Sequence, residues 1–315
     1  MIPTLLNGAV LLDKPMGITS HDVVARLRYV LRTKRIGHTG TLDPFATGLL
    51  ILCVGSSTRL SQFLTGKDKT YHATMRLGFA TDTQDYTGKP LSEPNSTEVV
   101  TEDNLREAMR HYPGDYAQLP PMYSAKKVDG ISLHRLARQG QVVFRSTAPV
   151  KIYELTLNPD EQGNTIRRNE TGTVDVDFTV SCSAGTYIRT LAHDIGQHLG
   201  CGAHLTALRR TRVGPFTIEQ ATTIEQLAGL PMEQIRASLL KPVELLKDWK
   251  LFQVSVTDHL KFVQGQAIPL DISGLDPISE ESDLLVGICT ESNDLLGIAR
   301  LNSQGKARPQ VVFNE

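Results

Sequence analysis

Residues 36–48 read Ile-Gly-His-Thr-Gly-Thr-Leu-Asp-Pro-Phe-Ala-Thr-Gly, and an uninterrupted apolar run over residues 49–54 follows at once. A short run that is apolar throughout is typical of a buried strand. The three glycines of the preceding stretch indicate a backbone that turns sharply or is closely approached by another segment. The sequence therefore predicts a turn-rich loop held beside a buried strand.

This loop contains one acid, Asp43, which Pro44 follows directly. The proline ring fixes the backbone after the carboxylate and so restricts where that carboxylate points. Two interpretations are open. Asp43 can cap a helix that has Pro44 at its first position, or it can be a functional carboxylate among small hydroxyl residues and His38.

Charge is unevenly distributed along the 315 residues, which together carry a formal net charge of −1. Residues 1–80 contain ten Lys and Arg against four Asp, a balance of +6. Residues 251–315 contain four Lys and Arg against nine Asp and Glu, a balance of −5. The basic part carries the Asp43 loop, which suits a polyanionic partner, although a solvated surface can show the same bias.

The four cysteines, Cys53, Cys182, Cys201 and Cys289, lie far apart and show no C-x-x-C spacing. This spacing argues against a zinc site and a disulfide framework, and it fits a reducing cytosol. No run approaches the roughly 20 apolar residues that a membrane span needs, and the first residues lack the features of an export signal. We therefore expect a cytoplasmic protein with no membrane partner.

Hydrophobic periodicity and turn residues predict a mixture of strands and helices. The expected strands lie at residues 10–12, 49–54, 71–77, 174–182, 284–289, 295–301 and 310–313. The expected helices begin at Ser20 and after Thr101, and cover residues 131–139, 187–199 and 258–264. Residues 82–96 and 158–172 are rich in polar and turn residues and are expected to be loops. A change of composition near residues 240–250 divides a larger domain, 1–245, from a small mostly-β domain, 250–315.

Residues 37–48 resemble the catalytic motif of the TruB family of tRNA pseudouridine synthases. Further blocks that resemble the family occur in the family's order, at residues 12–17, 68–71, 120–127, 185–191, 202–205 and 208–211. Together the blocks extend over about residues 8–215, and an ordered series is far more specific than one short pattern.

The resemblance implies an α+β fold, with a pseudouridine-synthase-like mixed antiparallel sheet and flanking helices in a catalytic domain over residues 1–245. The element order after residue 250, with Val263-Gln264-Gly265-Gln266 behind the expected helix, is similar to the family's PUA-like RNA-binding domain. The acidity of residues 250–315 argues against strong phosphate binding there.

The resemblance also implies an activity, the isomerisation of the T-loop uridine (position 55) of tRNA to pseudouridine. In this reaction the N1–C1′ bond breaks, the uracil rotates and rejoins the ribose through C5, with no atom gained or lost. No cofactor is needed, and the sequence contains no nucleotide-binding or metal-binding motif. The implied partner is tRNA, bound at its T-arm by a monomer with no obligate protein partner.

In this interpretation Asp43 is the nucleophile, which adds to C1′ or to C6 or assists through a glycal intermediate. Arg189 is its guanidinium partner and keeps the buried carboxylate ionised. Tyr71 stacks on the flipped uracil and can assist deprotonation at C5. Without the resemblance, Arg189 is interpreted as a surface residue at a helix start and Tyr71 as a half-buried strand residue.

Other positions are implied to contact the substrate. His38 contacts the RNA loop and helps to fill the gap left by the extruded base, Tyr187 closes the pocket, and Leu208 packs against the base. Lys14 and the pair at residues 209–210 are candidate phosphate or pocket contacts. Ordinary structural roles remain alternatives for His38 and Leu208.

Two other functions are weighed against this one. A non-catalytic tRNA-binding or RNA-folding protein can retain the same pocket, but the presence of Asp43, Tyr71 and Arg189 together argues against lost catalysis. A retaining glycoside hydrolase needs a second carboxylate about 5 Å from the first, and no motif in the sequence supplies one.

Overall fold

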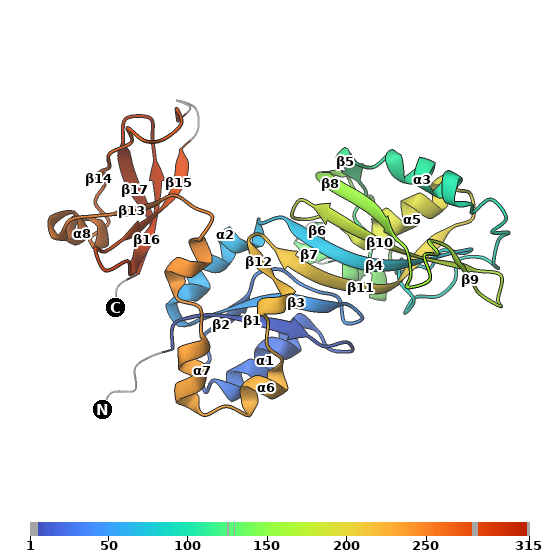
Figure 1. The fold of residues 1–315 in the computed structure, drawn as a ribbon, viewed down its shortest axis with the longest axis horizontal. Helices are drawn as coiled ribbons and strands as arrows, with labels where there is room; N and C mark the ends of the chain where they lie inside the picture. Colours follow the sequence, from blue (N-terminus) through green and yellow to red (C-terminus); the bar gives the residue numbers. More distant parts are fainter. Residues whose placement is uncertain (1–5, 125, 129, 279–282, 314–315) are drawn as a thin grey trace.

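Two β-sheets organise the part of the chain that the computed structural model describes, residues 6–124, 126–128, 130–278 and 283–313 (Figure 1). Within these residues a ten-stranded mixed sheet is flanked by helices, and a five-stranded sheet follows near the carboxyl terminus. The expected α+β class is therefore confirmed. Ala125, within the family-like block at 120–127, lies outside the described residues.

The large sheet is built from strands spread over most of the chain. They are β1 (Gly8–Lys14), β2 (Ile36–His38), β3 (Thr47–Val54), β4 (Lys69–Leu77), β5 (Gly114–Gln118), β8 (Ala148–Asn158), β9 (Arg167–Arg168), β10 (Val174–Cys182), β11 (Ala203–Val213) and β12 (Phe216–Thr217). The main order is β1-β3-β11-β4-β10-β8-β5, while β2, β9 and β12 pair with β3, β10 and β11. Strands β3 and β11, which are neighbours, pair in parallel. Strands β6 (Lys127–Val128) and β7 (Ile131–Ser132) form a separate ribbon.

The helices are short. They are α1 (Ser20–Val30), α2 (Ser61–Thr65), α3 (Glu102–Arg110), α4 (Leu133–Arg138), α5 (Ile188–His198), α6 (Ile224–Ala228), α7 (Met232–Ser238) and α8 (Val256–Val263), with 3₁₀ turns at Gly55–Leu60, Ile218–Gln220 and Pro242–Leu246. As expected, α1 begins at Ser20, and Thr101 caps α3 by accepting from the Asn104 amide. None of the helices in the described residues has the length and apolar character that a membrane crossing requires.

Strand β3 is buried on both faces, which explains its continuous apolar sequence. Every residue from Leu49 to Val54 is buried, and alternate side chains enter two different core clusters. The cluster of Leu50 includes the apolar face of α1, and the cluster of Leu49 includes residues of β1 and of the small sheet. The loop that precedes β3 is therefore attached to one of the best-packed strands of the protein.

A third cluster lies between β4, β10 and α5. Along β4 every second residue from Tyr71 to Leu77 is buried, as the alternating sequence predicts. Helix α5 covers this part of the sheet with Ile188, Leu191 and Ile195. The cluster brings the start of α5 close to the strand that carries Tyr71.

The small sheet has the order β13-β15-β16-β17-β14, from β13 (Leu251–Gln253), β14 (Ile268–Pro269), β15 (Leu284–Cys289), β16 (Leu295–Leu301) and β17 (Lys306–Val312). The bounds expected for β15 and β16 are confirmed. The strand expected at 310–313 begins earlier, at Lys306. Pro309 interrupts the sequence pattern because it has no amide donor, and a register shift beside Ala299 accommodates it in the sheet.

The two sheets are in contact near the end of the chain. Val311 and Phe313 share a core cluster with Leu49 of β3. Arg59 lies 6.0 Å from the ring centroid of Phe313 and donates to the carbonyl of Val312. The end of β17 therefore lies against the large sheet, and its beginning points away (Figure 1).

Candidate active site

The Asp43 loop connects β2 to β3 and does not begin a helix. Strands β2 and β3 form an antiparallel pair in which Ile36 lies opposite Val54. Between them the chain makes a tight turn, in which the amide of Ala46 donates to the carbonyl of Asp43 at 3.1 Å. The interpretation of Asp43 as a helix cap is therefore wrong, because its own strand pair closes the loop.

Neighbouring side chains fix the backbone on both sides of Asp43. The hydroxyl of Ser20 donates to the Leu42 carbonyl at 3.2 Å and accepts from the Leu42 amide at 2.9 Å. The amide of Gly17 donates to the Pro44 carbonyl at 2.8 Å. Helix α1 and the turn before it thus hold the residues directly before and after the carboxylate.

Lys14 is also part of this support. Its side chain is fully buried, and Nζ donates to the carbonyls of Pro15, Ile18 and Pro44 at 2.8, 2.7 and 3.4 Å. Burial lowers the pKa of Lys14 to about 8, against the opposing effect of the nearby Asp43 carboxylate. The ammonium group therefore holds the Asp43 loop through its backbone.

At the start of β3, the structure shows why position 48, one of the three glycine positions of the motif, requires glycine. Gly48 has φ +104°, and it pairs with Arg210 across the parallel β3–β11 contact. A β-carbon at this position would lie 2.3 Å from the Arg210 carbonyl oxygen. The close approach inferred from the sequence is therefore confirmed here.

The carboxylate of Asp43 is paired with Arg189. The distance from Nε to Oδ2 is 3.0 Å, and Nη2 donates to Oδ1 at 3.4 Å. The Arg189 side chain is 5 % exposed, whereas Asp43 is 34 % exposed and can reach a ligand. Burial raises the pKa of Asp43, the Arg189 guanidinium opposes this, and Asp85 adds to the increase.

Asp85 is a second acid on the same guanidinium, and sequence reasoning missed it. Its Oδ2 lies 3.2 Å from Nη1 of Arg189, and the side chain is buried. Its other oxygen accepts from the Thr87 amide at 3.0 Å and from the hydroxyls of Thr83 and Thr87 at 2.9 and 2.5 Å. The segment was predicted only as a loop. An acid between threonines, as around Asp43, was the available signal.

Two carbonyl oxygens complete the surroundings of Arg189. Nη1 donates to Thr83 and Nη2 donates to Tyr123, both at 2.8 Å. The guanidinium is therefore held from several directions in one plane, and its orientation determines that of the Asp43 carboxylate.

Tyr71 and Leu208 lie in the core beside this pair. Leu208 lies opposite Ala73, and Arg210 lies opposite Tyr71, in the β4–β11 register. Burial raises the pKa of Tyr71, while a hydrogen bond and the charge of Arg210 lower it. Tyr71 and Leu208 belong to the same cluster as Leu42, next to Asp43 in the chain.

Tyr187 is the residue before α5, two positions ahead of Arg189. Its amide donates to Oε1 of Gln118 at 2.7 Å, and its carbonyl accepts from Nε2 of Gln118 at 2.9 Å. Gln118 is buried in β5 and so fixes the start of α5. The ring of Tyr187 stays half-buried.

His38 lies at the end of β2, where the loop begins. Its ring makes an edge contact with His21, with centroids 5.4 Å apart, and its Nδ1 accepts from the Gly40 amide at 3.3 Å. Burial, together with the charges of His21 and Arg210, lowers the pKa of the His38 ring. His38 is half-buried, and it keeps a face that a ligand can contact.

The adjacent arginines Arg209 and Arg210 point to opposite sides of β11. Arg210 is buried and donates to the carbonyls of Leu49 and Gly40 at 2.7 and 3.2 Å. Arg209 is partly exposed and makes a two-point ion pair with Asp13 at 3.0 and 2.7 Å. Arg210 therefore holds the Asp43 loop, whereas Arg209 lies partly exposed in its ion pair with Asp13.

Comparison with known proteins identifies the family. The sequence pattern of the TruB family pseudouridylate synthase N-terminal domain matches residues 28–188. The chain belongs to the TruB family. The pattern of the tRNA pseudouridylate synthase B C-terminal domain matches residues 189–246, so both family domains lie before the small sheet.

Curated relatives of this TruB-family chain match it over nearly its full length. A tRNA pseudouridine synthase B of Burkholderia lata is 44 % identical over 299 residues, which cover 94 % of this chain and 87 % of the relative. One of Ralstonia nicotianae is 42 % identical, covering 98 % of this chain and 95 % of the relative. The TruB-family chain is thus a pseudouridine synthase, an isomerase.

Solved structures agree with this assignment. A chain in a crystal structure of a Cbf5-Nop10-Gar1 complex has a TM-score of 0.71 and 27 % identity, covering 98 % of this chain and 84 % of that chain. A chain in the structure of an H/ACA RNP bound to a substrate RNA containing 2′-deoxyuridine has a TM-score of 0.71 and 25 % identity. The latter match covers 99 % of this chain and 86 % of that chain.

Proposed function

We propose that this enzyme converts the T-loop uridine of tRNA to pseudouridine, with Asp43 as the nucleophile. The observation that carries the proposal is the two-point pair between Asp43 and Arg189, in a loop whose backbone is fixed on both sides of the acid. A carboxylate that only stabilised the fold would not need to remain 34 % exposed beside a buried guanidinium.

The chemistry follows from what each group supplies. Ionised Asp43 attacks C1′ or C6, or assists departure of the uracil through a glycal intermediate. The N1–C1′ bond breaks, a C5–C1′ bond forms, and the proton lost from C5 is balanced by a proton gained at N1. Arg189 orients the carboxylate and stabilises its charged form.

The neighbouring side chains fit the binding of an extruded base. Tyr71 provides an aromatic face on which uracil can stack, and Leu208 adds an apolar contact in the same cluster. Tyr187 closes the site from the start of α5, and His38 takes part in filling the gap that the base leaves in the RNA loop. Lys14 contributes indirectly, by holding the Pro44 carbonyl.

The proposal includes the form in which the enzyme acts. We infer a monomer that works in the cytoplasm without a protein partner, with a catalytic domain over residues 1–245 and an RNA-binding domain over residues 250–315. The basic balance of residues 1–80 supports contact with the polyanionic T-arm.

Mapping of pseudouridine in an unmodified tRNA transcript tests the proposal. We expect the wild-type protein to modify the T-loop uridine. The isosteric variant Asp43→Asn should bind the transcript with similar affinity and lose turnover by a factor on the order of 10³ or more. Product at another uridine, or turnover by the variant, would contradict the assignment.

A further inference from the structure

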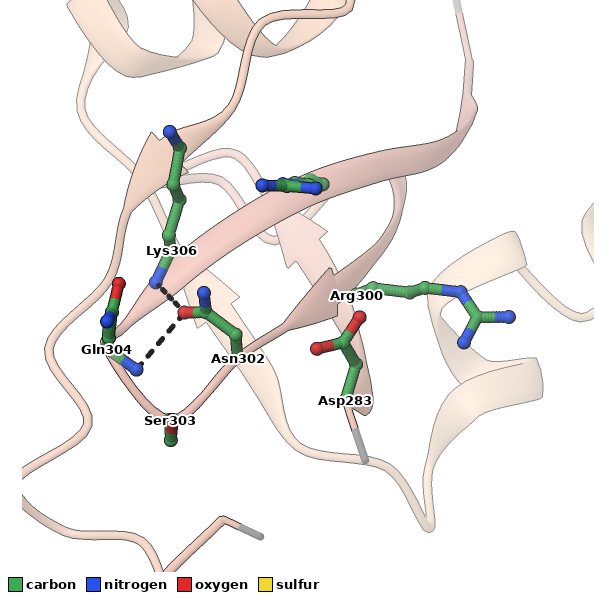
Figure 2. A pocket seen from close by; sticks show the side chains of 7 residues that line it. Asp283, Arg300, Asn302, Ser303, Gln304 and Lys306 are labelled. Carbon is green, nitrogen blue, oxygen red and sulfur yellow. Dashed lines mark hydrogen bonds between the residues drawn. The ribbon is translucent and has the colours of Figure 1, made fainter. Parts of the chain in front are cut away.

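A polar hollow of about 400 Å³ lies on the small carboxyl-terminal sheet, around the turn between β16 and β17 (Figure 2). Its lining includes three cations, Arg300, Lys306 and Arg308, and one acid, Asp283. Among the described residues that line the hollow the charge balance is therefore +2, although residues 251–315 as a whole carry −5. A concentration of positive charge in an otherwise acidic segment points to a specific anion.

The strand register holds two of these cations together. Arg300 of β16 lies directly opposite Arg308 of β17, and both side chains are exposed. Like charges in directly opposite positions destabilise a sheet. Within the described residues none of the three cations forms an ion pair with a carboxylate. A bound anion would relieve this repulsion.

The turn adds neutral donors beside the cations. Oδ1 of Asn302 accepts from the amides of Gln304 and Lys306 at 3.1 and 2.9 Å, which fixes the side-chain amide (Figure 2). Its Nδ2 donates to no other described residue and remains available for a ligand. The hydroxyl of Ser303 lines the same hollow. Guanidinium, ammonium, amide and hydroxyl donors around one space suit a tetrahedral oxyanion.

The position of the hollow indicates how far such a ligand must extend. The end of β17 packs against the large sheet, whereas Lys306 stands at its beginning. Seven residues of extended strand span about 20 Å. A ligand that contacts both the hollow and the large sheet beside the end of β17 must therefore extend over about 20 Å, as an RNA backbone can.

We propose that this hollow binds a backbone phosphate of the RNA substrate, outside the stem-loop that contains the reacting uridine. This inference rests on the proposed function, because it takes tRNA as the substrate. The surrounding acidity limits the contact to about one phosphate, since the rest of the domain repels an RNA backbone. Through this contact the carboxyl-terminal domain would favour a complete tRNA over an isolated stem-loop.

The test compares two RNA ligands, a full-length unmodified tRNA transcript and an isolated T-arm stem-loop. The double variant Arg300→Gln/Arg308→Gln should weaken binding of the full transcript about three- to tenfold. Its affinity for the stem-loop should be unchanged. The slope of log K against log salt concentration for the full transcript should fall by about 1.

A matched control is Lys250→Gln/Lys261→Gln, which removes two positive charges from the same domain outside the hollow. Equal weakening by both double variants, equal weakening for both RNAs, or unchanged binding of the full transcript would overturn the inference. Thermal unfolding confirms that each variant is folded. If the wild-type protein modifies no T-loop uridine, the proposed function fails first and the inference fails with it.

Discussion

The carboxylate of Asp43 forms an ion pair with Nε of Arg189 at 3.0 Å and accepts a hydrogen bond from Nη2 of the same residue at 3.4 Å. The two residues are 146 positions apart in the chain, and one comes from a loop while the other is in the first turn of α5. The guanidinium is nearly fully buried and also donates to two carbonyl oxygens, so its own position is fixed. It therefore determines the orientation of the Asp43 carboxylate.

Replacement of Arg189 should therefore affect turnover more than affinity. We expect Arg189→Lys, which keeps the charge but not the two-point geometry, to lower kcat about 10²- to 10³-fold with a Kd for tRNA within about threefold of wild type. Single-turnover rates and filter binding separate the two effects. Arg110→Gln, on the exposed face of α3, is the matched control. Equal losses of rate and affinity would show that Arg189 does not act through Asp43.

Asp85 is expected to act as a positioning residue. Asp85→Asn removes a negative charge that raises the pKa of Asp43. We expect kcat to fall about 10- to 100-fold, because Arg189 loses one of its anchors, with KM nearly unchanged. The acidic limb of the rate profile should move to lower pH, because ionised Asp43 becomes easier to form. A limb that stays in place would exclude electrostatic coupling between the two acids.

The raised pKa of Asp43 itself predicts a pH dependence. The mechanism uses the ionised carboxylate, so activity should fall as the pH decreases through the pKa of Asp43. Since burial raises that pKa, the fall should occur above the ordinary value of 3.8. Single-turnover rates between pH 4 and pH 8, at saturating RNA, measure this limb. A rate that stays constant down to pH 4 would contradict the prediction.

Lys69 provides a separate test of buried charge. Burial lowers its pKa from 10.5 to about 8, while Nζ donates to the carbonyls of Thr65 and Lys67. Between pH 8 and 10.5 the unfolded chain binds more protons than the folded one, so stability should rise with pH. Relative to Lys69→Met, the free energy of unfolding of the wild type should increase by up to about 3 kcal/mol across this range. Urea titrations at several pH values measure the difference, which should be flat below pH 8.

Gly48 should tolerate no side chain. Gly48→Ala combines a left-handed backbone with a contact of 2.3 Å to the Arg210 carbonyl, and we expect it to cost about 3 kcal/mol or more. Gly17→Ala is the matched control, because Gly17 has φ +88° and no atom within 4 Å of the added carbon. It should cost only about 1–2 kcal/mol. Similar costs for both would mean that conformation alone explains the loss.

Local sequence patterns predicted those elements whose burial is regular. The two-sided burial of β3 follows from a continuous apolar run, and the one-sided burial of β4 follows from alternating apolar and polar residues. The structure confirms both predictions. Strand β17 was predicted too short because Pro309 breaks the local sequence pattern. The strand continues through Pro309 because the register of its partner β16 shifts there, which the local sequence does not reveal.

The site was predictable only in part. Asp43 stands in a distinctive stretch, but its contact with Arg189 followed from family resemblance, since no local rule relates such distant residues. Asp85 was missed because a polar loop gives no sign of burial, which here comes from packing beside Leu205 of β11. The basic hollow was missed because the net charge of residues 251–315 is negative. Arg300 and Arg308 become neighbours only across the β16–β17 pair.

The shared cluster of Leu49, Val311 and Phe313 has a consequence for cooperativity. The strand that follows the nucleophile loses part of its apolar cover if the tail is removed. A chain cut before β13 would expose that surface to water and favour self-association. Calorimetry of the intact enzyme should accordingly record one melting transition. The tail stabilises the catalytic loop by packing against the strand that follows it.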